Sequence, residues 1–186
     1  MLLEDLHDAP CTCLPRPEYI ARVANRHRQK LRPKDPTDLS FQLDEDHIPD
    51  GFLRGDVTVC DRRHLMFATL EQLEHLARAK SWYVDGTFKL CRHPFTQLLS
   101  VNAFVRHDDH AKQVPLLFVL MSGRRKSDYR KVFRHLLEIL PSAPAVQQVT
   151  LDFERAVWRA LRDVIPQAIL QGCVFHWTLA LWRKVR

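Results

Sequence analysis

Two aspartates stand in segments where acidic side chains are disfavoured. Asp85 interrupts the apolar run WYVDGTF, and Asp152 ends the apolar run VTLDF. Acids are depleted in strands, and a carboxylate buried without a partner is costly, so each one needs a cation or hydrogen-bond donors. Two carboxylates at the ends of neighbouring strands can share one hard cation, because Mg²⁺ and similar ions prefer oxygen ligands. Cations held in this way activate the attacking oxygen and stabilise the leaving one in phosphodiester chemistry.

Each aspartate also has a purely structural alternative. Asp85 with the glycine after it can form a turn or lie at a sheet edge, and Asp152 can cap the helix that begins directly after it. A third carboxylate normally completes a site of this kind. Glu154 is expected to interact with the dipole of that helix, and Asp163 lies about 16 Å along the helix axis from its start. We therefore expect the third acid to lie outside this chain.

A second chemical pair is formed by Cys173 and His176. A thiol and an imidazole three residues apart can share a zinc ion, but a closed tetrahedral site needs two further ligands. The alternative is a buried cysteine and a histidine at a junction between a strand and a helix.

Basic residues exceed acidic ones and gather at two places. Lys and Arg total 28 against 22 Asp and Glu, which gives a formal charge of +6 and favours a polyanionic partner such as DNA. The candidate DNA-binding residues are Arg22, Arg26, Arg28, Lys30 and Arg32 near the N-terminus, and Arg124, Arg125 and Lys126 after Gly123. The alternatives are an exposed basic arm for the first group and a solvated turn for the second.

The elements that must position these residues follow from the periodicity of apolar side chains. Residues 1–60 predict a basic arm and a proline-rich linker, with one helix over 18–31; residues 61–186 predict an α/β domain. Strands are expected over 63–69, 81–90, 95–105, 114–121, 145–153 and 168–175, and helices over 69–79, 127–140, 154–165 and from 176 onward. The last five strands are typical of the mixed five-stranded sheet of the RNase H-like fold, although other mixed α/β folds remain open.

The composition also bears on the cellular setting. The five cysteines are odd in number and irregularly spaced, and an acidic N-terminal stretch precedes them in place of a secretory signal. Reduced thiols in an intracellular compartment are the expected state. The sequence has no apolar run of the length that crosses a membrane.

Several segments, in this order, resemble the transposases of Mutator-like elements (MULE). They are WYVDGTFK (82–89), FTQLLSVNAFV (95–105), VPLLFVLM (114–121), TLDFERAV (150–157) and GCVFHWTLALWRKV (172–185). The resemblance implies an RNase H-like fold with a DDE-type triad, in which Asp85 matches the first acid and Asp152 the second. It also implies Mg²⁺ or Mn²⁺ as cofactor. The family's glutamate would fall beyond Arg186, so the domain is expected to be incomplete at its C-terminus. Cys173 and His176 match the family's C-x-x-H motif.

The function expected from this resemblance is metal-dependent cleavage and transfer of DNA strands by a transposase-derived domain. Because one ligand is missing, the isolated chain is expected to be inactive. The alternatives are a domesticated, non-catalytic DNA-binding regulator and a fragment of a transposon gene. DNA is the expected partner, a homo-oligomer remains open, and the expected location is nuclear.

Overall fold

The computed structural model describes residues 16–31, 36–88, 90–107 and 110–185. The chain divides into two compact units, Met1–Asp35 and Pro36–Arg186. The first unit contains helix α1 (Pro17–Leu31), which confirms the helix expected over 18–31. Its apolar side chains Tyr19, Ile20 and Val23 are exposed, so α1 buries little apolar surface.

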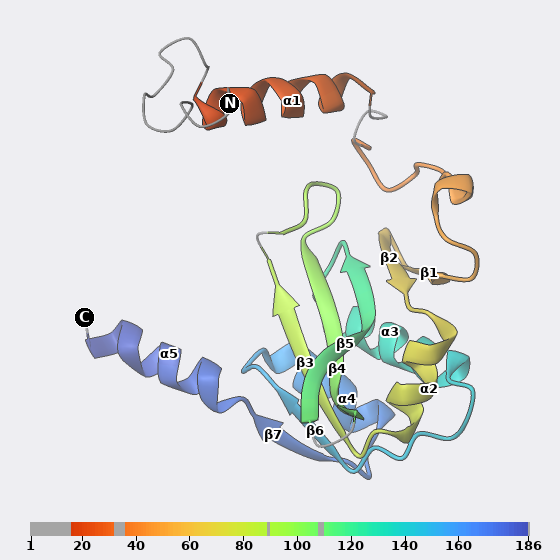
Figure 1. The fold of residues 1–186 in the computed structure, drawn as a ribbon. Coiled ribbons are helices and arrows are strands. Elements are labelled where there is room, and N and C mark those ends of the chain that lie inside the picture. The colour runs from red at the N-terminus through yellow and green to blue at the C-terminus, as the bar shows by residue number, and fades with distance from the viewer. Residues whose placement is uncertain (1–15, 32–35, 89, 108–109, 186) are drawn as a thin grey trace, which may run out of the picture. The chain divides into compact units, whose positions relative to one another are not determined.

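The second unit is built on one mixed sheet of seven strands (Figure 1). In chain order these are β1 (Leu53–Val59), β2 (Arg62–Phe67), β3 (Ser81–Thr87), β4 (Gln97–His107), β5 (His110–Met121), β6 (Gln148–Leu151) and β7 (Ile169–Gly172). Their order across the sheet is β1-β2-β5-β4-β3-β6-β7. Across the sheet, each neighbouring pair from β1 through β2, β5 and β4 to β3 is antiparallel. β6 pairs in parallel with β3, and β7 pairs in parallel with β6. The mixed sheet is confirmed, but the expected number of five strands is wrong.

The two additional strands are β1 and β2, which form a hairpin on the outer side of β5. The sequence predicted a strand close to β2 but none at β1, which lies before residue 61 in the expected linker. Gly55 and Asp56 weaken the strand signal of β1. A side chain at Gly55 would lie 2.4 Å from the His135 ring, so the glycine permits close packing of the hairpin against the helix that carries His135.

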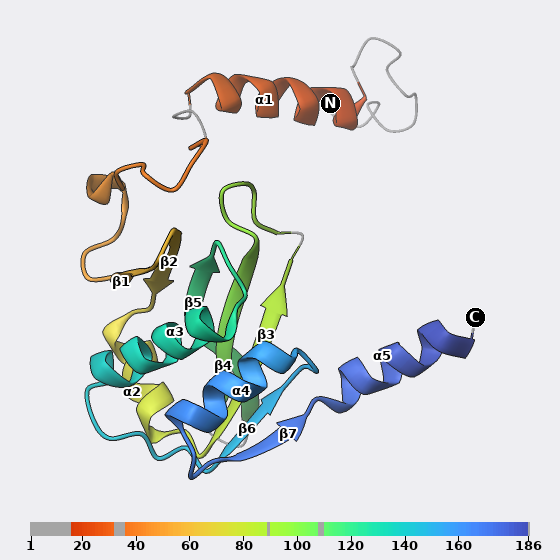
Figure 2. The same cartoon turned by 180° about the vertical axis from the view of Figure 1, so that it is seen from behind.

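Three helices pack on one face of the sheet. They are α2 (Leu70–Arg78), α3 (Lys126–Ile139) and α4 (Arg155–Val164), and Figure 2 shows α3 and α4 in front of the strands. Thr69 caps α2, because its hydroxyl accepts the Gln72 N–H at 3.1 Å. Helix α3 begins one residue before the helix expected over 127–140, and the Asp128 carboxylate accepts the Arg125 N–H at 2.8 Å. A further helix, α5 (Val174–Val185), follows β7.

Alternation along β3 divides its side chains between the helix-covered face and the opposite face. Trp82 and Val84 are buried, and the Trp82 indole donates to the Leu76 carbonyl of α2 at 3.0 Å. Successive side chains of a strand point to opposite faces, so Tyr83 and Asp85 lie on the other side of the sheet. The buried core therefore fixes which way Asp85 points.

A buried ionic cluster ties the β1–β2 hairpin to the start of α3. The Arg62 guanidinium donates from Nε to both carboxylate oxygens of Asp128, at 2.8 and 3.0 Å, and Asp128 is fully buried. His64, also fully buried, places Nε2 3.6 Å from Asp128 Oδ1. Neither ring nitrogen of His64 has a hydrogen-bond partner among the described residues.

The buried His64 makes the stability of the fold depend on pH. Burial lowers the pKa of its imidazole from 6.5, against the attraction of Asp128. Because the unfolded chain takes up this proton more readily, the free energy of unfolding is fully retained above pH 6.5 and falls as the pH decreases toward the folded-state pKa. We expect His64→Gln to flatten this slope, as measured by urea unfolding between about pH 7.5 and 5. Equal slopes for the variant and the wild type would contradict the assignment.

Candidate active site

The register of β3 and β6 brings the two predicted aspartates together at the carboxyl ends of these strands, an end of the sheet that we call the acidic edge. These strands run in parallel, and Val84 pairs with Leu151, so Asp85 and Asp152 are the next residues along neighbouring strands. Neighbouring strands lie about 4.8 Å apart, which places the two acidic positions within reach of one cation. Asp85 also pairs with Ser100 of β4, so it lies within a central strand. The alternatives in which Asp85 forms a turn or lies in an outer strand of the sheet are therefore wrong.

Asp152 is held by the first residues that follow it. Its Oδ1 accepts the Glu154 N–H at 3.1 Å, and its backbone carbonyl accepts the Trp158 indole N–H at 2.6 Å. The alternative in which Asp152 caps the helix is wrong, because the N-cap residue of α4 is Glu154 and the Asp152 carboxylate accepts the N–H of that residue, ahead of the helix. This contact orients the Asp152 carboxylate and does not remove it from the sheet edge.

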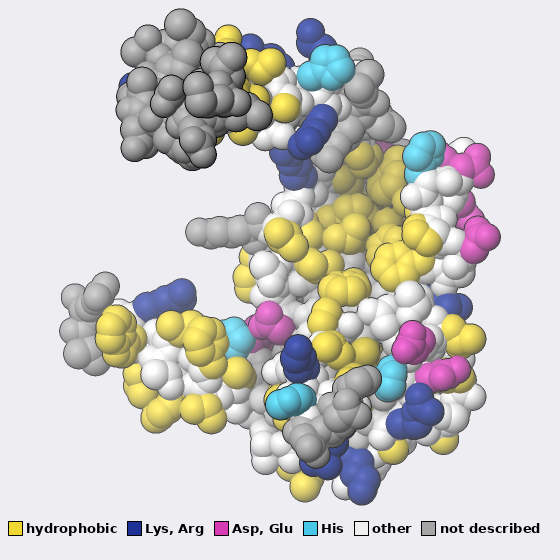
Figure 3. Space-filling view, viewed as in Figure 1, with side chains coloured by type: hydrophobic (Ala, Val, Ile, Leu, Met, Phe, Trp, Pro, Cys, Tyr) yellow, Lys and Arg dark blue, Asp and Glu magenta, His cyan; other side chains and the backbone are white. Residues whose placement is uncertain are grey.

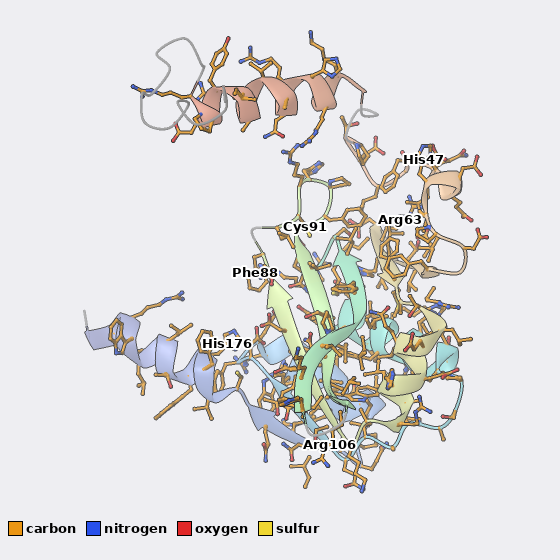
Figure 4. All side chains as sticks on the ribbon, in the orientation of Figure 1. His47, Arg63, Phe88, Cys91, Arg106 and His176 are labelled. Atoms are coloured by element: carbon orange, nitrogen blue, oxygen red, sulfur yellow. The ribbon has the colours of Figure 1, made fainter. Side chains whose placement is uncertain are left out.

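His176 supplies a contact to Asp85 that sequence reasoning did not foresee. Its Nε2 lies 3.6 Å from Asp85 Oδ1, an ion pair when the imidazole is protonated, and the two side chains are 35% and 48% exposed. Figure 4 places His176 in the first turn of α5, beside the end of β3, and Figure 3 shows a histidine against an acidic side chain in that region. The His176 Nδ1 is buried with no hydrogen-bond partner in the described part of the chain.

An open pocket of about 640 Å³ lies on this side of the sheet. It is lined by Asp85, Cys173 and His176 together with Tyr83, Val84, Ser100, Asn102, Gln113, Thr150, Val174 and Phe175. Asp152 is outside this lining. Cys173 is fixed through its backbone N–H, which donates to the Leu151 carbonyl at 2.8 Å. The C-x-x-H pair therefore belongs to the same edge as Asp85, and a zinc ion held by it stays a prediction.

Glu154 belongs to a buried hydrogen-bond chain that the sequence did not reveal. Its Oε2 accepts from the Tyr129 hydroxyl at 3.0 Å, and that hydroxyl accepts from Gln97 Nε2 at 2.7 Å. Burial raises the pKa of the Glu154 carboxyl and the charge of Asp152 raises it further, against the Tyr129 hydrogen bond and Arg124. The contact with Tyr129 joins α3 to the first turn of α4, so Glu154 does more than face the helix dipole.

The predicted basic turn lies beside the acidic edge. The Arg124 guanidinium stacks 4.8 Å from the centre of the Phe88 ring, directly after β3, and its charge also acts on Glu154. Arg125 is exposed, and Lys126 Nζ lies 2.7 Å from Asp163 Oδ2. Of the three basic residues in this turn, Arg124 is therefore the one whose charge acts on an acid near the site, Glu154.

The other predicted DNA-binding residues lie in the first unit. Arg22, Arg26, Arg28 and Lys30 are exposed on α1, and Arg32 lies outside the described residues. Their exposure is compatible both with DNA contact and with a solvated arm.

Among the described residues, no group of three or more His, Cys, Asp or Glu side chains is arranged to hold a metal ion. The acidic pair offers carboxylate oxygens, the donor type that suits Mg²⁺ and Mn²⁺. A cation held by Asp85 and Asp152 therefore stays a prediction, with carboxylate oxygens as the ligands on offer.

Comparison with known families identifies the domain. A family model described as the MULE transposase domain matches residues 81–179, which is more than half of the 186-residue chain. The chain belongs to the MULE transposase domain family. No match was found among curated proteins. Membership in this family implies an interaction with DNA. No helix in the described ranges is long and apolar enough to cross a membrane.

Proposed function

We propose that this domain carries the metal-binding machinery for cleavage and transfer of DNA strands, on an RNase H-like sheet. The observation that carries the proposal is the parallel register of β3 and β6, which makes Asp85 and Asp152 neighbours at one edge. The strand order β5-β4-β3-β6-β7, antiparallel up to β3 and parallel beyond it, supports the RNase H-like assignment.

In this proposal Asp85 and Asp152 hold Mg²⁺ or Mn²⁺ through carboxylate oxygens. When bound, such ions activate the attacking oxygen and stabilise the leaving oxygen of a phosphodiester. The chain's own residues orient the pair: the Glu154 N–H holds Asp152, and His176 lies beside Asp85. Because DNA is the substrate, the nucleus is the proposed location.

The test pairs metal binding with DNA nicking. Titration of the full chain with Mn²⁺, and incubation with supercoiled plasmid in Mn²⁺ or EDTA, measure the two properties separately. Metal binding that requires Asp85 supports the proposal, and nicking confined to the Mn²⁺ samples extends it to catalysis by this chain. Absence of both overturns it.

A second candidate function is DNA binding without catalysis. The row of exposed basic residues on α1 favours it. DNA affinity that falls steeply with salt and is unchanged in Asp152→Asn, with no nicking in any metal, would select this function. No DNA affinity at low salt would exclude it.

A further inference from the structure

Helix α4 presents a row of arginines on its exposed side. Arg155, Arg159 and Arg162 are exposed and follow helical spacing, while Val157 and Leu161 on the opposite side are buried. With Phe153 and Trp158, the three arginines line a shallow groove of about 340 Å³. A helix with this division has one face in the core and one strongly cationic face.

Helix α3 adds a second row of cations beside the end of α4. The two helices pack together, and Lys126 Nζ lies 2.7 Å from Asp163 Oδ2. The Lys126 hydrogen bond lowers the pKa of the Asp163 carboxyl, and the charges of Lys126, Arg130 and Arg134 lower it further. These three cations therefore lie near Asp163, the residue that follows Arg162.

The six cations are poorly compensated within the fold. Among the described residues, the ion pair between Lys126 and Asp163 is the one that involves any of them. Like charges held close together repel one another, and a polyanion relieves that repulsion while releasing its own counterions. The surface is therefore complementary to a chain of phosphates.

We propose that this α3–α4 surface, formed by Lys126, Arg130, Arg134, Arg155, Arg159 and Arg162, binds the sugar-phosphate backbone of duplex DNA. The inference rests on DNA being the partner in the proposed function, and it is independent of metal chemistry. The Trp158 indole, which lines the groove, donates to the Asp152 carbonyl, so the groove begins next to Asp152. Duplex held there would flank the site of strand cleavage.

The aromatic residues of the groove favour contact with the backbone over contact with bases. The Trp158 indole N–H is engaged by the Asp152 carbonyl at 2.6 Å, and the Arg162 guanidinium lies 5.8 Å from its ring centre. The Phe153 ring packs against Gly172. Single-strand binders use aromatic rings as stacking platforms for successive bases, whereas Arg and Lys positioned at a duplex contact its phosphates.

The test compares two charge reversals of equal size in the full chain. Arg159→Glu/Arg162→Glu removes two cations of the groove, and Arg106→Glu/Lys112→Glu makes the same change on exposed residues of the β4–β5 hairpin. Arg106 lies six residues beyond Ser100, the pairing partner of Asp85, or about 20 Å along the strand. Cys91 follows β3, the strand that carries Asp85, and Figure 4 shows Arg106 toward the opposite end of the sheet from Cys91.

Affinity for a labelled short duplex is measured by fluorescence anisotropy in EDTA over a series of salt concentrations. We expect the α4 variant to lose at least about tenfold in affinity, and its salt dependence to fall by about 0.9 per lost phosphate contact. The hairpin variant should lose much less. Circular dichroism confirms that both variants are folded.

Equal losses in the two variants, or no loss in the α4 variant, overturn the inference. A loss confined to single-stranded DNA or RNA of the same length overturns the choice of duplex. Unchanged duplex binding by the α4 variant, together with Mn²⁺ binding that requires Asp85, removes this surface and leaves the proposed function standing. Duplex binding that is weakened in the α4 variant, with no Mn²⁺ binding by the wild type, supports this surface and overturns the metal-dependent part of the proposed function.

Discussion

Asp152→Asn is expected to weaken Mn²⁺ binding to the full chain by more than about 10–100-fold, because loss of an outer-sphere partner alone costs a metal site that much. The substitution isolates the charge of the carboxylate. Asparagine keeps an Oδ1 that can accept the Glu154 N–H, and the Trp158 contact is to the backbone carbonyl, so neither hydrogen bond need be lost. Isothermal titration with Mn²⁺ measures the effect, and any metal-dependent nicking should fall with it.

The matched control for this variant is Asp61→Asn, which removes the same charge from a carboxylate that is 86% exposed. It should leave Mn²⁺ affinity within about twofold of the wild type, because an exposed charge outside the site is strongly screened. Equal losses in the two variants would show that Asp152 acts through net charge alone. A fall in the melting temperature of Asp152→Asn would show that its carboxylate has a structural role.

The two aspartates were predictable because each breaks a local pattern. An acid within an apolar strand, and an acid at the end of another, are visible in a single stretch of sequence. Their adjacency depends on the pairing of β3 with β6, which joins residues far apart in the chain through a crossover. The expectation that the two strands are neighbours came from the predicted order of strands and helices in a mixed sheet, and the family resemblance then supported it.

The residues that support the site could not be predicted from local patterns, because their contacts depend on tertiary packing. Tyr129 lies on α3 and Glu154 precedes α4 as its N-cap residue, so their contact depends on how the two helices pack. His176 reaches Asp85 because β7 places the start of α5 beside this end of the sheet. The helical spacing of Arg155, Arg159 and Arg162 is visible in the sequence, but the second row on α3 depends on how the two helices pack. Local patterns thus predict faces and ends of elements, and tertiary pairing decides what those faces meet.

The strand that sequence reasoning missed, β1, pairs with β2, and β2 carries an arginine in a buried ion pair. Arg62 is 12% exposed and Asp128 is fully buried, so the pair joining the β1–β2 hairpin to α3 is almost completely shielded from water. Removal of one partner from such a pair leaves an uncompensated charge, at a cost of about 3–5 kcal/mol.

Asp128→Asn is therefore expected to lower the free energy of unfolding by about 3–5 kcal/mol and the melting temperature by about 10 °C. Beyond the lost charge, one oxygen becomes an amide donor. That donor must face either the Arg62 guanidinium or the Arg125 N–H, and both of these are donors themselves. Urea unfolding followed by tryptophan fluorescence gives the free energy, and thermal circular dichroism gives the melting temperature.

Asp61→Asn again serves as the matched control, because Asp61 contacts the same arginine at 3.0 Å from the exposed side. It should change the free energy of unfolding by less than about 1 kcal/mol, since exposed ion pairs contribute little. An Asp128→Asn effect as small as this would mean that water or rearrangement compensates Arg62. A large effect confined to Asp128→Asn would show that the buried side of the Arg62 contact, and not its exposed side, stabilises the fold.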